Sequence, residues 1–171
     1  PDLVAETLSV CHAKMLDISR VFRFAQNCIY LGRGMNFPVS LEGALKLKEV
    51  SYVHAEGYPA AAMKHGPIAL VDPFMPIILI ATTSDPTHAK ICSNIEEILA
   101  RRGAIIVVTE VGNTDFDDRV DSVVHVPTTS VEMLFPIIFV IPLQFLAYYV
   151  ADMRGNDVDR PRNLAKSVTV E

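Results

Sequence analysis

The stretch 76–109, PIILIATTSDPTHAKICSNIEEILARRGAIIVVT, decides the fold class of this chain. Two short apolar runs, 76–81 and 104–109, are each typical of a buried strand, and the segment 85–102 between them is predicted to be a helix that ends before Gly103. A strand, a helix and a second strand in this order indicate two parallel strands joined by a crossover helix. The stretch therefore predicts an α/β domain.

The same alternation of strands and helices continues on both sides of this stretch. The further expected elements are helix 3–25, strand 28–31, helix 38–55, loop 57–66, strand 122–126 and helix 130–151, which Gly155 closes. We expect a doubly wound parallel β-sheet flanked by helices on both faces, formed by residues 1–155. Residues 156–171 lack amphipathic periodicity and are predicted to be a C-terminal tail.

Composition indicates a globular protein and excludes some partners. Half of the 171 residues are hydrophobic and a fifth are charged, which is typical of a chain with a buried core. The net charge of −5, without a basic run, argues against a nucleic-acid partner. The chain starts without Met and without a signal peptide, so we expect it to be a piece of a longer chain.

Cysteine and histidine usage indicates a cytoplasmic protein without a metal. Cys11, Cys28 and Cys92 form no Cys-x-x-Cys pair and are expected to be reduced thiols. The five histidines show no metal-ligand spacing, so no metal site is expected. The apolar segment 134–151 approaches the length of a membrane span, but two prolines and a glutamine interrupt it, which favours a buried helix.

Two turns after strands were considered as phosphate or nucleotide sites. Gly32 and Gly34 begin a G-x-G-x-x-G pattern, but Phe37 occupies the third glycine position, which excludes a dinucleotide site. The segment 82–85, with Thr87 nearby, offers hydroxyls and amides to a phosphate at a helix start. Ser, Thr and Asp are also the preferred helix N-caps, and this interpretation is the stronger one.

The stretch 41–49, LEGALKLKE, places three charged residues on one helical face. Glu42, Lys46 and Glu49 follow one another at steps of four and three. Such a stripe is either a surface ladder of ion pairs or a proton-transfer site in which Lys46 keeps one glutamate ionised while the other carries a proton.

Two further residues were considered for chemistry. His65 stands between Lys64 and Gly66-Pro67 in the predicted loop, where a histidine suits acid–base exchange or simply packs against the domain. Lys166 lies in the tail, where a lysine is usually solvated, although a desolvated amine can attack a carbonyl.

Three segments carry a resemblance to a known family. These are LEGALKLKEVSYVHAE (41–56), KHGPIALV (64–71) and DRPRNLAKSVTVE (159–171). They resemble the end of the glucosamine-6-phosphate synthases, the isomerising glutamine–fructose-6-phosphate aminotransferases, and the resemblance covers essentially the whole chain. The matching piece is the second of two sugar isomerase (SIS) domains, which implies a flavodoxin-like three-layer sandwich.

The resemblance implies roles for the helix and the loop. Glu49 would be the base that moves a proton between sugar C1 and C2, supported by Lys46 and Glu42 on the same face. Glu42 would also bind the substrate. His65 would assist opening of the sugar ring and would reach across from the neighbouring subunit. Such a shared site implies a homodimer.

The tail receives its roles from the same resemblance. Lys166 would form the Schiff base with the open-chain ketose, while Arg162 and Ala165 would bind substrate, Arg162 also ordering the tail over the active site. Before His65, however, Ala62 and Met63 stand where the family has Glu and Leu.

The implied reaction converts fructose 6-phosphate and glutamine-derived ammonia to glucosamine 6-phosphate, in the cytoplasm and without a cofactor, a metal, a nucleic acid or a membrane. The first SIS domain and the glutaminase domain would be the partners of this domain within a longer chain. The family's Ser-x-Ser-Gly-x-Thr phosphate cradle has no counterpart here, so the isolated domain is expected to be inactive. The alternative is a regulatory SIS module that binds sugar phosphates without catalysis.

Overall fold

The computed structural model describes residues 1–164 of the chain. Its helices are α1 (Asp2–Phe22), α2 (Asn36–Ser51), α3 (His88–Leu99) and α4 (Phe135–Met153), with short 3-10 helices η1 (Ala60–His65), η2 (Pro67–Leu70) and η3 (Glu132–Leu134). Its strands are β1 (Asn27–Gly32), β2 (His54–Pro59), β3 (Pro76–Ile80), β4 (Ala104–Glu110) and β5 (Ser122–Val126).

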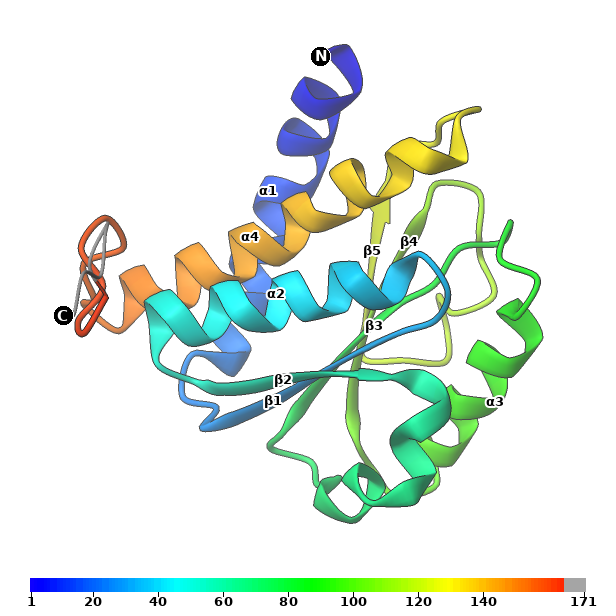
Figure 1. Cartoon of the computed structure of the whole chain (residues 1–171), viewed down its shortest axis with the longest axis horizontal. Coiled ribbons are helices and arrows are strands. Elements are labelled where there is room, and N and C mark those ends of the chain that lie inside the picture. Colours follow the sequence, from blue (N-terminus) through cyan, green and yellow to red (C-terminus); the bar gives the residue numbers. More distant parts are fainter. Residues whose placement is uncertain (165–171) are drawn as a thin grey trace, which may run out of the picture.

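The strands form one parallel sheet in the order β2-β1-β3-β4-β5 (Figure 1). Helices α1, α2 and α4 cover one face, where their apolar side chains pack on Tyr30, Ile78 and Ile106. Helix α3 and η1 cover the other face, against Leu31 and Leu79. The predicted doubly wound, three-layer α/β fold is confirmed.

The segment after α2 corrects one prediction. We expected a helix over 38–55 and a loop over 57–66, but α2 ends at Ser51 and β2 follows at His54. Tyr52 turns the chain with a left-handed backbone (φ 60°), and the Val53 side chain is buried. The strand was missed because HAEGYP is an edge strand with mixed burial, which lacks the apolar run of a central strand.

Other boundaries differ from the prediction because of local caps. The helix expected over 85–102 is α3, which starts only at His88 because the Asp85 carboxylate accepts hydrogen bonds from the amide and hydroxyl of Thr87, both at 2.7 Å. It ends early, and Arg102 then adopts a left-handed backbone (φ 59°). The helices expected over 3–25 and 130–151 are Asp2–Phe22 and Phe135–Met153, the second preceded by η3.

Two glycines allow α2 to lie close to its neighbours. A Cβ on Gly32 would come within 2.3 Å of the Asn36 carbonyl oxygen, so glycine permits α2 to begin directly after β1. A Cβ on Gly43 would lie 2.6 Å from Leu143 Cδ1 and 2.9 Å from a ring carbon of Tyr30. Gly43 therefore sets how closely α2 approaches α4 and the sheet.

The apolar helix belongs to the protein core. The segment Glu132–Met153 is long and apolar enough, by length and composition alone, to cross a membrane. In the fold it packs against α1 and α2, and Phe139, Leu143 and Leu146 are almost fully buried in the core on that face of the sheet. The prediction of a buried helix is confirmed, and the core accounts for its apolar sequence.

Candidate functional site

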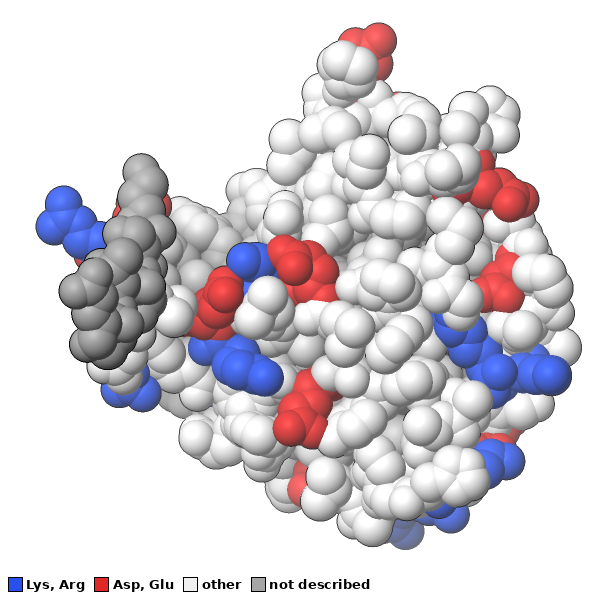
Figure 2. All heavy atoms as spheres, in the orientation of Figure 1, with Lys and Arg blue, Asp and Glu red and all other residues white. Residues whose placement is uncertain are grey.

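The three charged residues of α2 lie on one face, as their spacing predicts. Lys46 Nζ is 2.8 Å from Glu49 Oε2 and 3.7 Å from Glu42 Oε1. The side chains are 42% exposed at Glu42, 35% at Lys46 and 29% at Glu49, so exposure falls toward the carboxyl end of the helix. Figure 2 shows acidic and basic side chains gathered over α2. The stripe is half-buried, whereas the neighbouring Lys48 is exposed.

Lys46 is held as a cation. The hydrogen bond to Glu49 raises the pKa of Lys46 most strongly, the charges of Glu49 and Glu42 raise it further, and partial burial opposes them. An amine must lose its proton before it can attack a carbonyl. Lys46 therefore suits electrostatic support of its two glutamates, and a nucleophilic amine has to come from elsewhere.

The chain after α4 docks at the carboxyl end of this same helix. The backbone N–H of Arg162 donates to Tyr52 Oη at 2.8 Å, and the Arg162 guanidinium lies 4.0 Å from the centre of the Tyr52 ring. Tyr52 is the C-cap of α2, three residues after Glu49. The described part of the predicted tail thus lies at the end of the helix that carries the charged stripe.

Two more residues fasten this segment to the rest of the fold. Arg154 donates to the carbonyls of Ser51 at 3.2 Å, Arg23 at 2.7 Å and Ala25, so one guanidinium joins the ends of α1, α2 and α4. Asn156 donates to the Val50 carbonyl at 3.2 Å. The sequence reasoning missed Tyr52, Arg154 and Asn156. The sequence signal for Arg154 and Asn156 is a polar cluster directly after a long apolar helix, and Tyr52 has no such signal.

The predicted tail residues Ala165 and Lys166 lie outside the described residues. The structure therefore places Glu42, Lys46, Glu49 and Arg162 at one helix, and says nothing of these two positions.

His65 lies apart from the stripe within one chain. It is exposed at the end of η1, which packs with Met63 into the core on the α3 side of the sheet. Lys64 Nζ reinforces this attachment through an ion pair with Glu97 of α3 at 2.6 Å. Helix α2, with Leu47, packs on the opposite face. The loop position expected for His65 is thus a short 3-10 helix on the far side of the sheet from Glu49.

In the loop after β3, the donors of Thr83 and Thr87 are already engaged. Thr83 donates both its amide, at 2.7 Å, and its hydroxyl to the Glu110 carboxylate, while Asp85 accepts from Thr87. Asp85 and Glu132 also line the pocket of about 180 Å³ beside this loop. Carboxylates at these positions repel an anion, which argues against a phosphate site. The N-cap residue of α3, Thr87, makes no side-chain capping bond, and Asp85 instead forms a turn with Thr87 before the helix.

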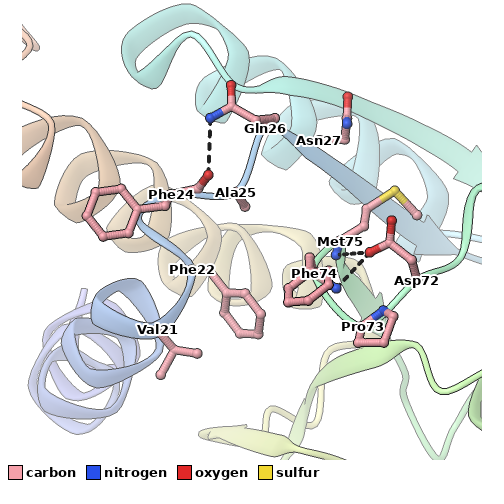
Figure 3. A pocket seen from close by; sticks show the side chains of 10 residues that line it. All are labelled: Val21, Phe22, Phe24, Ala25, Gln26, Asn27, Asp72, Pro73, Phe74 and Met75. Carbon is pink, nitrogen blue, oxygen red and sulfur yellow. Dashed lines mark hydrogen bonds between the residues drawn. The ribbon is translucent and has the colours of Figure 1, made fainter.

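A cavity of about 340 Å³ opens at the amino ends of β1 and β3, the edge opposite to the one where parallel sheets usually bind ligands. Figure 3 shows its lining residues, which come from segments 21–27 and 72–75. Among these described lining residues Asp72 alone is ionisable, and its carboxylate accepts from the amides of Phe74 and Met75. Its one carboxylate is engaged by its own loop, so the cavity is a weaker candidate for sugar chemistry than the stripe on α2.

Comparisons with known proteins agree with this geometry. The chain is 56% identical, over all 171 residues, to the glutamine–fructose-6-phosphate aminotransferase (isomerizing) of Chlorobaculum tepidum and 53% identical to that of Bacteroides thetaiotaomicron. It spans 27% of the length of each of these curated relatives. A solved structure, the C-terminal domain of glucosamine-fructose-6-phosphate aminotransferase from Francisella tularensis, superposes with a TM-score of 0.83 at 39% identity, over 93% of this chain and 44% of that one.

The family is shown by a match to most of the chain. The SIS domain model matches residues 22–154, from the end of α1 to the residue after α4. The strands, α2 with its charged stripe and η1 with His65 all fall within this range. The chain belongs to the SIS domain family.

Proposed function

We propose that this chain is the second SIS domain of a glucosamine-6-phosphate synthase, with residues 1–155 forming the domain and residues 156–171 the tail that closes over its active site. The observation that carries the proposal is the docking of Arg162 on Tyr52, at the end of the helix that presents Glu49. High identity to the aminotransferases over the full chain supports the same assignment.

The short chain length between Arg162 and Lys166 supports Lys166 as the Schiff-base lysine. Lys166 is four residues beyond Arg162, and four extended residues span at most about 14 Å. Glu49 lies two residues before the end of α2 at Ser51, and Tyr52 follows directly. An amine at position 166 is therefore within reach of a sugar bound beside Glu49, with Ala165 and Arg162 contacting the same molecule.

The proposed chemistry divides between the tail and α2. The Lys166 amine adds to the C2 ketone of open-chain fructose 6-phosphate, and water leaves to give the Schiff base. Ammonia derived from glutamine then displaces Lys166. Glu49 takes a proton from C1 and returns one to C2, leaving an aldehyde at C1 and the amino group at C2. Lys46 and Glu42 hold Glu49 and the neighbouring hydroxyls in place.

His65 completes this site only from a second copy of the chain. Within one chain, η1 and α2 pack on opposite faces of the sheet, which separates His65 from Glu49. A homodimer that brings the η1 of one copy to the α2 of the other would supply a group able to accept and donate protons during ring opening.

Substitution of Glu49 in the full-length protein tests the proposal. Glu49→Gln keeps the size of the side chain but removes the base, so kcat is expected to fall by about 10²–10⁴-fold with KM for fructose 6-phosphate little changed. Glu6→Gln, at an exposed position of α1, is the matched control and should leave both constants unchanged. A Glu49→Gln variant with normal kcat would show that Glu49 is not the base, and absence of turnover in the parent protein would leave only a sugar-phosphate-binding module.

The 171-residue chain alone is expected to be inactive toward fructose 6-phosphate. In the loop after β3, hydroxyls and amides that could bind a phosphate donate instead to the carboxylates of Glu110 and Asp85. The phosphate of the substrate would therefore have to be bound by the first SIS domain. Assays of glucosamine 6-phosphate formation from the isolated chain with added ammonia check this expectation, and measurable turnover would contradict it.

A further inference from the structure

A cluster of three potential metal ligands lies at the carboxyl edge of the sheet, on the α3 side. One ligand atom each from His88, Cys92 and Asp115 lies within 4.8 Å of the other two. His88 and Cys92 are four residues apart on α3, and Asp115 follows β4. These residues have no part in the proposed sugar chemistry.

The hydrogen bonds of His88 leave one ring nitrogen facing a negative charge. His88 Nδ1 lies 3.1 Å from the Thr82 carbonyl oxygen, which can only accept, so Nδ1 carries a proton. Nε2 lies 2.8 Å from Asp115 Oδ2, which as a carboxylate is also an acceptor. Nε2 and the carboxylate oxygen thus face each other across a short gap, an arrangement in which a cation can be bound by both. A backbone carbonyl on the far nitrogen is the usual support of a metal-bound imidazole.

The surroundings hold these ligands in place. Phe116, fully buried, packs against the His88 ring with the ring centres 5.6 Å apart. The amide of Asp115 donates to Asn113 Oδ1 at 3.2 Å, and its carbonyl accepts from Arg119 at 3.3 Å. Arg119 also pairs with Glu96 of α3, which offsets its positive charge.

We propose that His88, Cys92 and Asp115 bind a zinc ion, with a fourth position open to water. Imidazole, thiolate and carboxylate are all zinc ligands, and the mixture favours Zn²⁺ over Mg²⁺ or Ca²⁺, which take oxygen ligands. A tetrahedral centre needs the imidazole nitrogen and the sulfur about 3.6 Å apart. The present separations of at most 4.8 Å thus require a shift of about an ångström. The ion would tie α3 to the 111–121 connection.

Titration of the metal-free protein with Co²⁺ tests the site, because cobalt replaces zinc and reports a thiolate ligand by a charge-transfer absorption. We expect this absorption to saturate at one equivalent, to be bleached by Zn²⁺ and to vanish in Cys92→Ser. Asp115→Asn should keep the absorption but weaken the affinity for Co²⁺ by at least about 10-fold. This is the lower end of the affinity loss usually seen when a residue around a bound metal is replaced.

Cys11→Ala is the matched control, because Cys11 is buried on the opposite face of the sheet. It should leave the cobalt spectrum and affinity unchanged. Thermal unfolding of the metal-free variants should match that of the parent protein, which separates lost ligands from lost folding. The absence of a thiolate absorption at one equivalent, or an identical absorption in Cys92→Ser, would overturn the site and leave only the hydrogen bonds of His88 to Thr82 and Asp115.

Discussion

At the scale of single residues, Lys46 joins the two glutamates of the charged stripe. The spacing of Glu42, Lys46 and Glu49 predicted one shared face, and the structure confirms the contacts. The sequence left open whether the stripe is an ordinary ladder of ion pairs, since that depends on burial and on what docks nearby. Half-burial and the neighbouring tail, neither of which a helical period encodes, favour the proton-transfer interpretation.

Lys46→Gln is expected to lower the free energy of unfolding at pH 7 by less than about 1 kcal/mol, since each half-exposed pair contributes about 0.2–0.5 kcal/mol. The pKa of Lys46 is raised in the fold, so its stabilisation is fully present below the ordinary lysine value of 10.5 and is lost as pH rises through the folded value. Urea unfolding between pH 7 and 12 checks the trend.

Lys48→Gln is the control for this series, because Lys48 is exposed and forms no ion pair within residues 1–164. Its effect should stay near zero at every pH. A stability difference for Lys46→Gln that persists unchanged above pH 11 would show that the charge of Lys46 is not the cause.

At the scale of elements, α2 must satisfy both the core and the site. Its glycine faces Leu143 and Tyr30, while the charged stripe faces outward. Gly43→Ala is expected to destabilise the protein by about 1–3 kcal/mol through overpacking, although alanine is the better helix former by about 1 kcal/mol. Chemical denaturation measures the change.

A double-mutant cycle with Leu143→Ala locates the cause. Removing the Leu143 methyls that the new Cβ would meet should make the double variant more stable than the sum of the single effects predicts. If the two stability effects are strictly additive, or if Gly43→Ala is as stable as the parent, α2 and α4 are not closely packed at this crossing.

The attachment of the tail depends on the hydroxyl of Tyr52. Tyr52→Phe removes the acceptor of the Arg162 amide but keeps the ring under its guanidinium. Hydrogen exchange at the Arg162 amide is expected to speed up by at most about 10-fold, because a typical hydrogen bond contributes about 1 kcal/mol. Tyr148→Phe, at a half-exposed position of α4, should leave that amide unchanged. Equal exchange in Tyr52→Phe and the parent would refute the contact.

At the scale of the whole molecule, the fold was predictable where strands are buried on both sides. The strands at 76–81 and 104–109 can be recognised as continuous apolar runs, because both faces of a covered parallel sheet are apolar. Strand β2 was missed because an edge strand with Glu56 and Gly57 carries no such run.

Long-range groupings were beyond the sequence for a different reason. His88 and Cys92 have the i, i+4 spacing of helical ligands, but Asp115 joins them only because β4 returns the chain to the same edge. The docking of Arg162 on Tyr52 joins residues 110 positions apart. Neither long-range contact leaves a periodic signal, so the sequence predicted the stripe and missed both Tyr52 and the grouping of Asp115 with His88 and Cys92.

Borohydride trapping tests most directly whether the tail brings an amine to the sugar beside Glu49. Reduction of the full-length protein in the presence of fructose 6-phosphate should fix a sugar adduct on the peptide that contains Lys166, as read by mass spectrometry. Lys166→Arg should abolish the adduct, and Lys64→Arg, at the ion pair with Glu97, should leave it intact. An undiminished adduct in Lys166→Arg would contradict the account.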